Sequence, residues 1–189
     1  MGSTVRLYQD IDCCLNASHN ARAWRREGDD VNAGYCRGFA SPRHDDNGAY
    51  VSDEDGYRKR PSFRMEWNER LIEALNELPV ELVWTTTWRE DARQVGTLMG
   101  VTLEPQRVLH PISGVTEFPS IDWKWAAIIQ EQELDPSPFI AVDDEWDGVT
   151  RYKRDAIKAL GGLLISPDPN LGMTPADIEK MKAYIAEHG

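Results

Sequence analysis

The sequence has little cysteine and no long apolar run. Its three cysteines, two of them adjacent at Cys13 and Cys14, match neither a disulfide framework nor the C-x-x-C pairs of a zinc site, so we expect reduced thiols. No run of about eighteen apolar residues predicts a membrane span, and the N-terminus lacks the pattern of a signal peptide. We therefore expect a cytoplasmic protein with no membrane partner.

Positive charge is also scarce. The 189 residues include 21 Lys and Arg against 32 Asp and Glu, which gives a formal net charge of −11. Because nucleic-acid binding depends on neutralising phosphates with Lys and Arg, we expect no generic affinity for DNA or RNA. A local basic pocket is still compatible with this balance. The length suits one substantial core with room for an insertion.

The apolar residues that are present gather in short runs rich in Val, Ile and Leu. We predict strands at Val5–Gln9, Val80–Trp84, 107–110, Phe139–Val142 and 163–166. Helical spacing occurs at 65–78, 91–99, 123–131 and 151–160, and a capping box with Pro at its first helical position opens a final helix at 174. This alternation predicts an α/β fold with a doubly wound parallel sheet of about five strands.

One segment, residues 18–62, interrupts the alternation. It is rich in Gly, Asp, Arg and Asn and has almost no apolar periodicity. Since a structureless loop of this length is unusual inside a compact domain, we predict a core of 1–17 and 63–189 with a small cap-like insertion at 18–62. The insertion and its border are locally basic through Arg22, Arg25, Arg26, Arg37, Arg43, Arg58, Lys59 and Arg60. The first three have helical spacing, and their face is either simply solvated or attracts a phosphate.

Polar residues follow several predicted strands at the point where each strand ends. They are Asp10 and Asp12 after the first strand, Thr85, Thr86 and Thr87 after the second, and Asp143 and Asp144 after the fourth, with Lys124 at the start of the preceding helix. In open parallel sheets, ligands bind outside the carboxyl ends of the strands. We therefore expect these side chains to converge on one crevice.

Residue types then indicate the chemistry of this crevice. Several carboxylates sharing one site need a cation, and hard oxygen ligands suit Mg²⁺. A carboxylate can attack a phosphorus atom to give an acyl-phosphate, while a Thr hydroxyl and a Lys ammonium neutralise the transferring oxygens. Taken alone, Asp10 and Asp12 could instead be solvated turn residues.

The whole set resembles the haloacid-dehalogenase-like (HAD) superfamily, whose motifs run in the order D-x-D, Thr or Ser, Lys, and an acidic pair. It is more closely similar to a group of small actinobacterial and phage proteins with D-x-D-G-V-L-N, V-W-A-T-x-W, W-K and V-D-D-E. The corresponding segments here are 10–16 (DIDCCLN), 83–88 (VWTTTW), 123–124 (WK) and 142–145 (VDDE). The resemblance covers the first sixteen residues and most of 80–189.

The resemblance implies a role for each matching residue. Asp10 would be the nucleophile and Asp12 the general acid and base. Thr86, with Thr87 beside it, and Lys124 would bind the phosphoryl group, and Thr85 is the alternative to Thr86. Magnesium would be held within the acidic set of Asp10, Asp12, Asp143 and Asp144. The first strand would be central in the sheet.

The resemblance also implies a substrate class. The function would be hydrolysis of a phosphomonoester on a phosphorylated small molecule, a nucleotide or a nucleic-acid end, because the related group is linked to RNA end repair. The alternative is a catalytically weak scaffold of this fold that binds a protein partner. One departure keeps that alternative open: Cys13 stands where the family has Gly, and a positive φ there would strain a cysteine.

Tryptophans lie close to the candidate motifs. Those within a few residues of them are Trp84, Trp88, Trp123, Trp125 and Trp146. They could form a wall on which a nucleobase stacks, or they could pack between helices and sheet. We expect packing.

Overall fold

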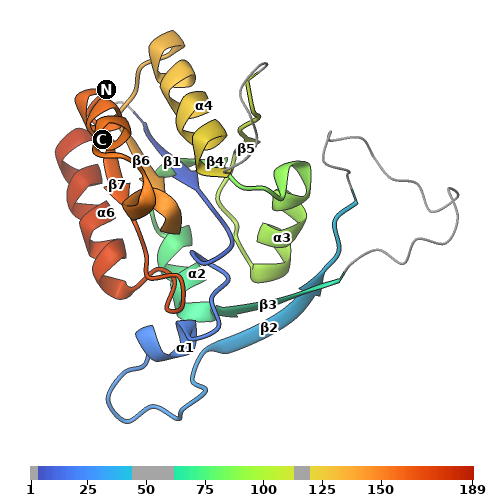
Figure 1. Ribbon diagram of the computed structural model, residues 1–189. Helices are drawn as coiled ribbons and strands as arrows, with labels where there is room; N and C mark the ends of the chain where they lie inside the picture. Colours follow the sequence, from blue (N-terminus) through green and yellow to red (C-terminus); the bar gives the residue numbers. More distant parts are fainter. Residues whose placement is uncertain (1–3, 44–61, 113–119) are drawn as a thin grey trace, which may run out of the picture.

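The computed structural model describes residues 4–43, 62–112 and 120–189, and a five-stranded parallel sheet forms its centre (Figure 1). The strands are β1 (Val5–Gln9), β4 (Val80–Trp84), β5 (Gln106–Val108), β6 (Phe139–Val142) and β7 (Leu163–Ile165), in the spatial order β5-β4-β1-β6-β7. The middle strand, β1, pairs in parallel with β4 on one side and with β6 on the other. The predicted α/β class and the central position of the first strand are confirmed.

Helices cover both faces of this sheet. One face packs against α2 (Glu69–Asn76), α3 (Ala92–Met99) and α6 (Pro175–His188), and the other against α4 (Ser120–Leu134) and α5 (Arg151–Ala159) (Figure 1). Because successive strand residues point to opposite faces, Leu7 joins the first core cluster and Tyr8 the second. The fully apolar strands β6 and β7 reflect this two-sided burial.

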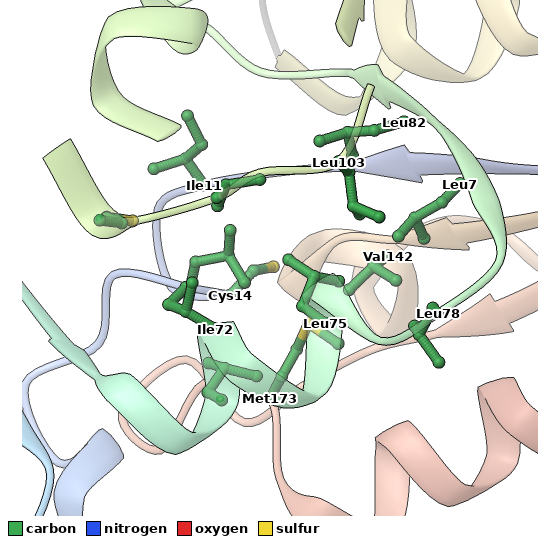
Figure 2. Close-up of a cluster of buried hydrophobic side chains, with 14 of the residues drawn as sticks. Leu7, Ile11, Cys14, Ile72, Leu75, Leu78, Leu82, Leu103, Val142 and Met173 are labelled. Atoms are coloured by element: carbon green, nitrogen blue, oxygen red, sulfur yellow. The ribbon is translucent and has the colours of Figure 1, made fainter. Parts of the chain in front are cut away.

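The larger core cluster lies between the sheet and helices α2, α3 and α6. Leu7, Leu82 and Val142 come from three neighbouring strands, and Ile72 and Leu75 of α2 pack onto them (Figure 2). Leu7, Leu75 and Leu82 are fully buried. Burying such a side chain stabilises the fold by about 1.5–3 kcal/mol each, so this cluster fixes the position of β1 and of the residues that follow it.

The predicted helix over 65–78 is wrong in its first part. Residues Phe63–Asn68 form strand β3, and α2 begins only at Glu69. Asn68 caps the helix, since its side chain accepts a hydrogen bond of 3.0 Å from the Arg70 backbone N–H. Met65 and Trp67 are buried on one side of β3, so the buried positions of this segment repeat every two residues. Trp67 also fits the helical spacing of the residues that follow, which is why the sequence predicted one continuous helix. Pairing with a partner strand that is distant in sequence therefore outweighs the local helical spacing.

That partner is strand β2 (Tyr35–Ala40), which lies antiparallel to β3 in a separate two-stranded sheet (Figure 1). The segment before β2 contains one short helix, α1 (Asn20–Ala23). Arg70 reaches from α2 to this segment, where it forms a two-pronged ion pair with Asp29 and donates to the Trp24 carbonyl at 3.1 Å. The insertion is therefore tied to the core at α2. Its division from the core as a cap remains a proposal.

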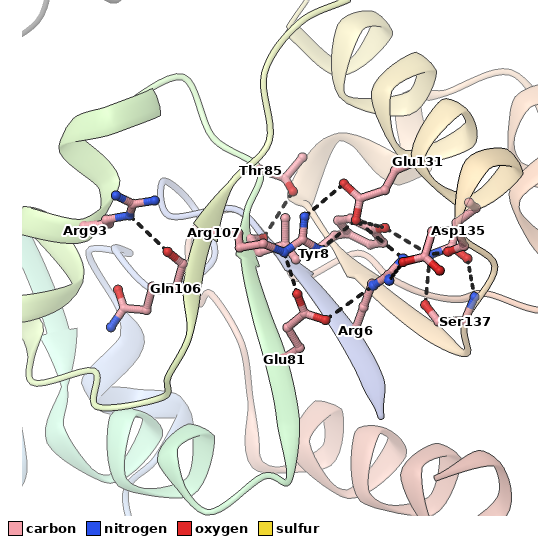
Figure 3. Close-up of polar contacts among 12 residues, drawn as sticks. Arg6, Tyr8, Glu81, Thr85, Arg93, Gln106, Arg107, Glu131, Asp135 and Ser137 are labelled. Carbon is pink, nitrogen blue, oxygen red and sulfur yellow. Dashed lines mark hydrogen bonds and ion pairs between the residues drawn. The ribbon is translucent and has the colours of Figure 1, made fainter. Parts of the chain in front are cut away.

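A network of charged side chains ties α4 to the opposite end of the sheet from Asp10. Arg107 of β5 binds Glu81 of β4 at 2.5 Å and Glu131 of α4 at 2.8 Å, and Arg6 of β1 lies 3.4 Å from Glu81 (Figure 3). Tyr8 donates to Glu131 at 3.0 Å. These pairs hold three strands and one helix together and take no part in the crevice.

The start of α6 follows the predicted signals. The backbone N–H of Thr174 donates to the Asp177 carboxylate at 3.0 Å, which completes the predicted capping box of α6, and Pro175 is its first helical residue. Among the described residues, no helix has the length and apolarity needed to cross a membrane.

Candidate active site

The candidate residues meet where β1, β4 and β6 end. The backbone N–H of Asp10 donates to the Val142 carbonyl at 3.0 Å, and Thr85 donates to Gln9 at 2.9 Å, so the three strand ends are in register. Lys124 reaches the same place from the first half of α4. The predicted convergence of Asp10, the Thr run, Lys124 and Asp143 is therefore seen in the fold.

Lys124 forms the centre of this arrangement. Its Nζ donates to Asp10 Oδ2 at 2.7 Å and to Asp143 Oδ2 at 2.6 Å, and its side chain is 2% exposed. Burial by itself lowers the pKa of Lys124, but attraction to Asp10 and Asp143 outweighs it and raises the pKa above its usual value. The ammonium stays charged and holds two carboxylates that would otherwise repel each other.

The acidic residues still carry more negative charge than Lys124 neutralises. Burial raises the pKa of Asp143, and repulsion from Asp10 adds to the effect, although Lys124 opposes it. Burial and Asp10 likewise raise the pKa of Asp144. Asp143 also caps the 3₁₀ helix η3 (Asp144–Gly148), where its Oδ1 accepts from the Glu145 N–H at 2.9 Å. The site therefore favours an added cation.

Two of these acids are placed to bind such a cation. One ligand atom each of Asp10, Cys14 and Asp144 lies within 4.8 Å of the others. Burial raises the pKa of the Cys14 thiol well above its usual value, so it stays neutral and is a poor ligand for a hard ion. The carboxylate oxygens of Asp10 and Asp144 suit Mg²⁺ by their chemistry and their closeness. Those of Asp10 already accept hydrogen bonds from Ile11 and Lys124, so a bound cation would share them with these donors.

Asp12 has both carboxylate oxygens occupied. Oδ1 accepts from the Asn16 side-chain amide and Oδ2 from the Trp88 indole N–H, each at 2.8 Å. Burial raises the pKa of Asp12, and the two hydrogen bonds oppose this shift without cancelling it. Sequence reasoning missed both positioning partners. Asn16 belonged to the quoted D-x-D motif but suggested no role by itself.

Cys13 adopts the left-handed backbone conformation that the family's glycine would adopt, with φ of 57°. Its N–H donates to the Asn16 carbonyl at 2.8 Å, which closes the turn after Asp12. Burial, and then the carboxylate of Asp144, raise the pKa of its thiol to about 11, so the thiol is neutral near pH 7. The cysteine is accommodated in the turn at the cost of backbone strain.

The threonines differ in what their hydroxyls do. Thr85 donates to the Val83 carbonyl at 3.3 Å, which uses its proton. Thr86 is fully buried, and its oxygen accepts from the Trp88 N–H at 3.4 Å, so its proton is left to donate to a ligand. Thr87 is exposed in the same turn. This geometry favours Thr86 over Thr85 as a phosphate ligand.

The tryptophans mostly pack, as expected. Trp84, Trp123 and Trp146 are buried in the two core clusters. Trp125 donates to the Lys153 carbonyl at 3.0 Å beside α5. Trp88 is the exception, because it contacts Asp12 and lies edge-to-face with Phe63 at 5.5 Å between ring centroids.

The predicted basic helical face is wrong. Helix α1 ends at Ala23, so Arg25 and Arg26 lie beyond it and share no helical face with Arg22. All three side chains are exposed, and Arg25 donates to the Asp29 carbonyl at 3.3 Å. Arg58, Lys59 and Arg60 lie outside the described residues.

Comparison with known proteins assigns the family. The model of the family described as "HAD domain in Swiss Army Knife RNA repair proteins" matches residues 7–178. Since this is most of the 189-residue chain, the chain belongs to that family, and the HAD resemblance is confirmed. No curated protein and no solved structure gives a significant match.

Proposed function

We propose that the chain, as a member of this family, is a Mg²⁺-dependent phosphomonoester hydrolase that forms an aspartyl-phosphate on Asp10. The observation that carries the proposal is the buried Lys124, bonded at once to Asp10 and Asp143 at the carboxyl edge of the sheet. A structural lysine in the core gains little from two carboxylates there, because burying charge is costly. A phosphoryl group placed between Asp10 and Lys124 would use the same charges.

The proposed reaction proceeds in two displacements at phosphorus. A carboxylate oxygen of Asp10 attacks phosphorus, the bond to the ester oxygen breaks, and Asp12 gives its proton to the leaving oxygen. Asp12 then accepts a proton from water, the water oxygen attacks phosphorus, and the bond to Asp10 breaks to release inorganic phosphate. The raised pKa of Asp12 supports its role as the proton donor.

The remaining residues would bind the phosphoryl oxygens. The Lys124 ammonium and the Thr86 hydroxyl, with Thr87 at the mouth of the site, supply positive charge and hydrogen-bond donors. A bound Mg²⁺ would supply further positive charge to these oxygens. Asp10 and Asp144 are its best-placed ligands, with Asp12 and Asp143 as further candidates.

The family's description supports a nucleic-acid substrate. Its members are HAD domains in RNA repair proteins, so we propose a phosphorylated nucleic-acid end, or a nucleotide, as the substrate. The insertion at 18–62 is placed to influence this choice. Its strand β2 pairs with β3 of the adjoining segment, and β3 is bonded to the turn after Asp12, since Asn16 Oδ1 accepts from the Glu66 N–H at 2.8 Å.

A second candidate function rests on Cys13. Its strained backbone, with φ of 57°, could weaken turnover and leave a scaffold of this fold that binds a protein partner. An activity measurement separates the two functions. The scaffold requires a wild-type protein that is inactive on every phosphomonoester at any Mg²⁺ concentration.

The deciding experiment measures hydrolysis of p-nitrophenyl phosphate and of oligoribonucleotides with terminal phosphates. We expect activity that needs Mg²⁺, disappears in chelator and is lost in Asp10→Asn, because the amide keeps the shape but not the attacking charge. The matched control is Glu179→Gln on α6, an exposed carboxylate outside the proposed chemistry. Undiminished turnover in Asp10→Asn would overturn the proposal.

A further inference from the structure

A cavity on the other side of the acidic loop has no role in the reaction just described. It has a volume of about 480 Å³ and lies between α5 and the end of β7. Trp146 and Leu164 provide apolar walls, and Arg151, Arg154 and Lys158 bring three cations to it. The volume falls within the range of about 300–1,000 Å³ typical of ligand sites.

The three cations share one side of α5. Their spacing of three and then four residues places them on one helical face, while Ile157 is buried on another. Two carboxylates also line the cavity, each next to an arginine: Asp155 lies 3.4 Å from Arg151, and Asp147 lies 3.9 Å from Arg154. Lys158 forms no ion pair with any described residue. The cavity thus has net positive charge on a chain whose net charge is −11.

The cavity shares a wall with the candidate active site. Ser166 lines it, donates to the Asp144 carbonyl at 3.1 Å and accepts from the Asp147 N–H at 3.2 Å. Asp147, which lines the cavity, follows Asp143 by four positions, so at about 3.8 Å per position the cavity begins within roughly 15 Å of the acidic site. A strand of a few nucleotides is long enough to span this distance, whereas a single phosphate group with one aromatic ring is not.

One wall of the cavity also holds an unused hydrogen-bond donor. Trp146 is 2% exposed, and its indole N–H has no acceptor among the described residues. Buried indole N–H groups normally have a partner. The indole nitrogen is itself buried, so this donor is not open to the cavity in the present structure.

We propose that this cavity binds the sugar-phosphate chain of a single-stranded nucleic acid whose terminal phosphate lies at Asp10. The inference rests on the proposed function and specifies its substrate as a strand rather than a free nucleotide. Arg151 and Lys158 contact the phosphodiester oxygens, and arginine can do so with two parallel hydrogen bonds. The strand then runs from Asp10 across the loop at Asp144 to the outer face of α5.

The test compares a small and a long substrate in the double variant Arg151→Gln/Lys158→Gln. Both side chains are exposed, so their replacement leaves the core intact. For a short oligoribonucleotide with a terminal phosphate, we expect KM to rise about tenfold with nearly unchanged kcat, because only uniform binding is lost. For p-nitrophenyl phosphate, which is too short to reach the cavity, both constants stay within about twofold.

Salt dependence gives a second readout. Each lost phosphate contact should reduce the slope of log affinity against log salt by about 0.7 for a single strand, so two lost contacts reduce it by up to about 1.4. The matched control is Lys180→Gln/Lys182→Gln on α6, which removes the same charge from residues paired with Asp177 and Glu179. An equal rise in KM and an equal reduction of the salt slope in this control would show a general charge effect and overturn the proposal.

Binding without turnover separates this proposal from the proposed function. Fluorescence anisotropy of a labelled oligoribonucleotide that lacks a terminal phosphate measures the strand contacts alone. If the wild-type protein hydrolyses no ester, the proposed function fails, and weaker binding by the double variant still supports the cavity. If hydrolysis is normal but the double variant keeps wild-type KM, affinity and salt slope, the cavity proposal fails and the function stands.

Discussion

The indole N–H of Trp88 donates to Asp12 Oδ2 at 2.8 Å, although the two residues are 76 positions apart. Trp88 also packs edge-to-face against Phe63, at the start of β3. The orientation of Asp12, the proposed acid, therefore depends on Trp88 in the turn after β4. Through Trp88 this turn also contacts β3, the strand that follows the insertion. Four predictions follow from this and related contacts.

Replacing Trp88 with Phe should impair the acid while keeping an aromatic ring against Phe63. A hydrogen bond to a charged group contributes about 1.5–3 kcal/mol, so we expect kcat on alkyl phosphates to fall at least about tenfold. Activated aryl esters should change less, because their leaving groups need little protonation. Trp125→Phe is the matched control, since it removes an indole bond to the Lys153 carbonyl instead. Equal losses in the two variants would contradict the assignment.

Replacing Asp12 with Ala should separate substrates by their leaving groups. Esters with poor leaving groups need a proton at the ester oxygen, so we expect their kcat to fall by about 10²–10⁴-fold, while p-nitrophenyl phosphate loses much less. A series of aryl and alkyl phosphates measures this difference. Uniform losses along the series would identify Asp12 as a metal ligand or structural residue.

Replacing Cys13 with Gly should stabilise the protein. The left-handed conformation costs a non-glycine residue about 1–2 kcal/mol. Glycine avoids this cost but loses about 0.5–1 kcal/mol through its larger unfolded-state entropy, so we expect the free energy of unfolding to rise by up to about 1.5 kcal/mol. Urea denaturation measures it. Cys36→Gly, in strand β2 with no positive φ, should destabilise. A loss of stability in Cys13→Gly would mean that the thiol contact with Asp144 outweighs the strain.

The Asp29–Arg70 ion pair should make the anchoring of the insertion sensitive to acid. The hydrogen bond from Arg70, followed by that from the Arg26 backbone N–H, lowers the pKa of Asp29 to about 2. A carboxyl with a lowered pKa in the folded state contributes stability above its unfolded pKa of about 3.9 and loses it as the pH falls toward 2. The variant Asp29→Asn should therefore melt at a lower temperature than the wild type near pH 5. This difference in melting temperature should shrink as the pH falls toward 2.

The control for this prediction is Asp30→Asn, which changes an exposed neighbouring carboxylate that accepts from the Asn32 N–H at 2.9 Å. The difference in melting temperature between Asp30→Asn and the wild type should not shrink in the same way as the pH falls. A constant gap between Asp29→Asn and the wild type from about pH 5 to 2 would refute the role of the ion pair.

The sequence by itself determined the sheet and the list of candidate residues. The run Phe139–Val142 is apolar on both faces, and Val80–Trp84 is interrupted only by Glu81, which is typical of parallel strands covered on both sides. The threonines and the acids stand directly after these runs. Chain order along these runs therefore predicted which side chains meet. The family match over residues 7–178 confirms the HAD-like class of this fold.

Only the tertiary structure decided the contacts between residues distant in sequence. The strand at Phe63–Asn68 exists because β2 pairs with it, and its own pattern reads equally well as the start of a helix. The Thr85 hydroxyl donates its proton to the Val83 carbonyl, whereas the Thr86 hydroxyl accepts a hydrogen bond from the Trp88 N–H. Three identical residues in a row cannot reveal this difference. Asp12 is held by Asn16 and Trp88, and a hydrogen bond depends on distances that the spacing of residues along a chain does not determine.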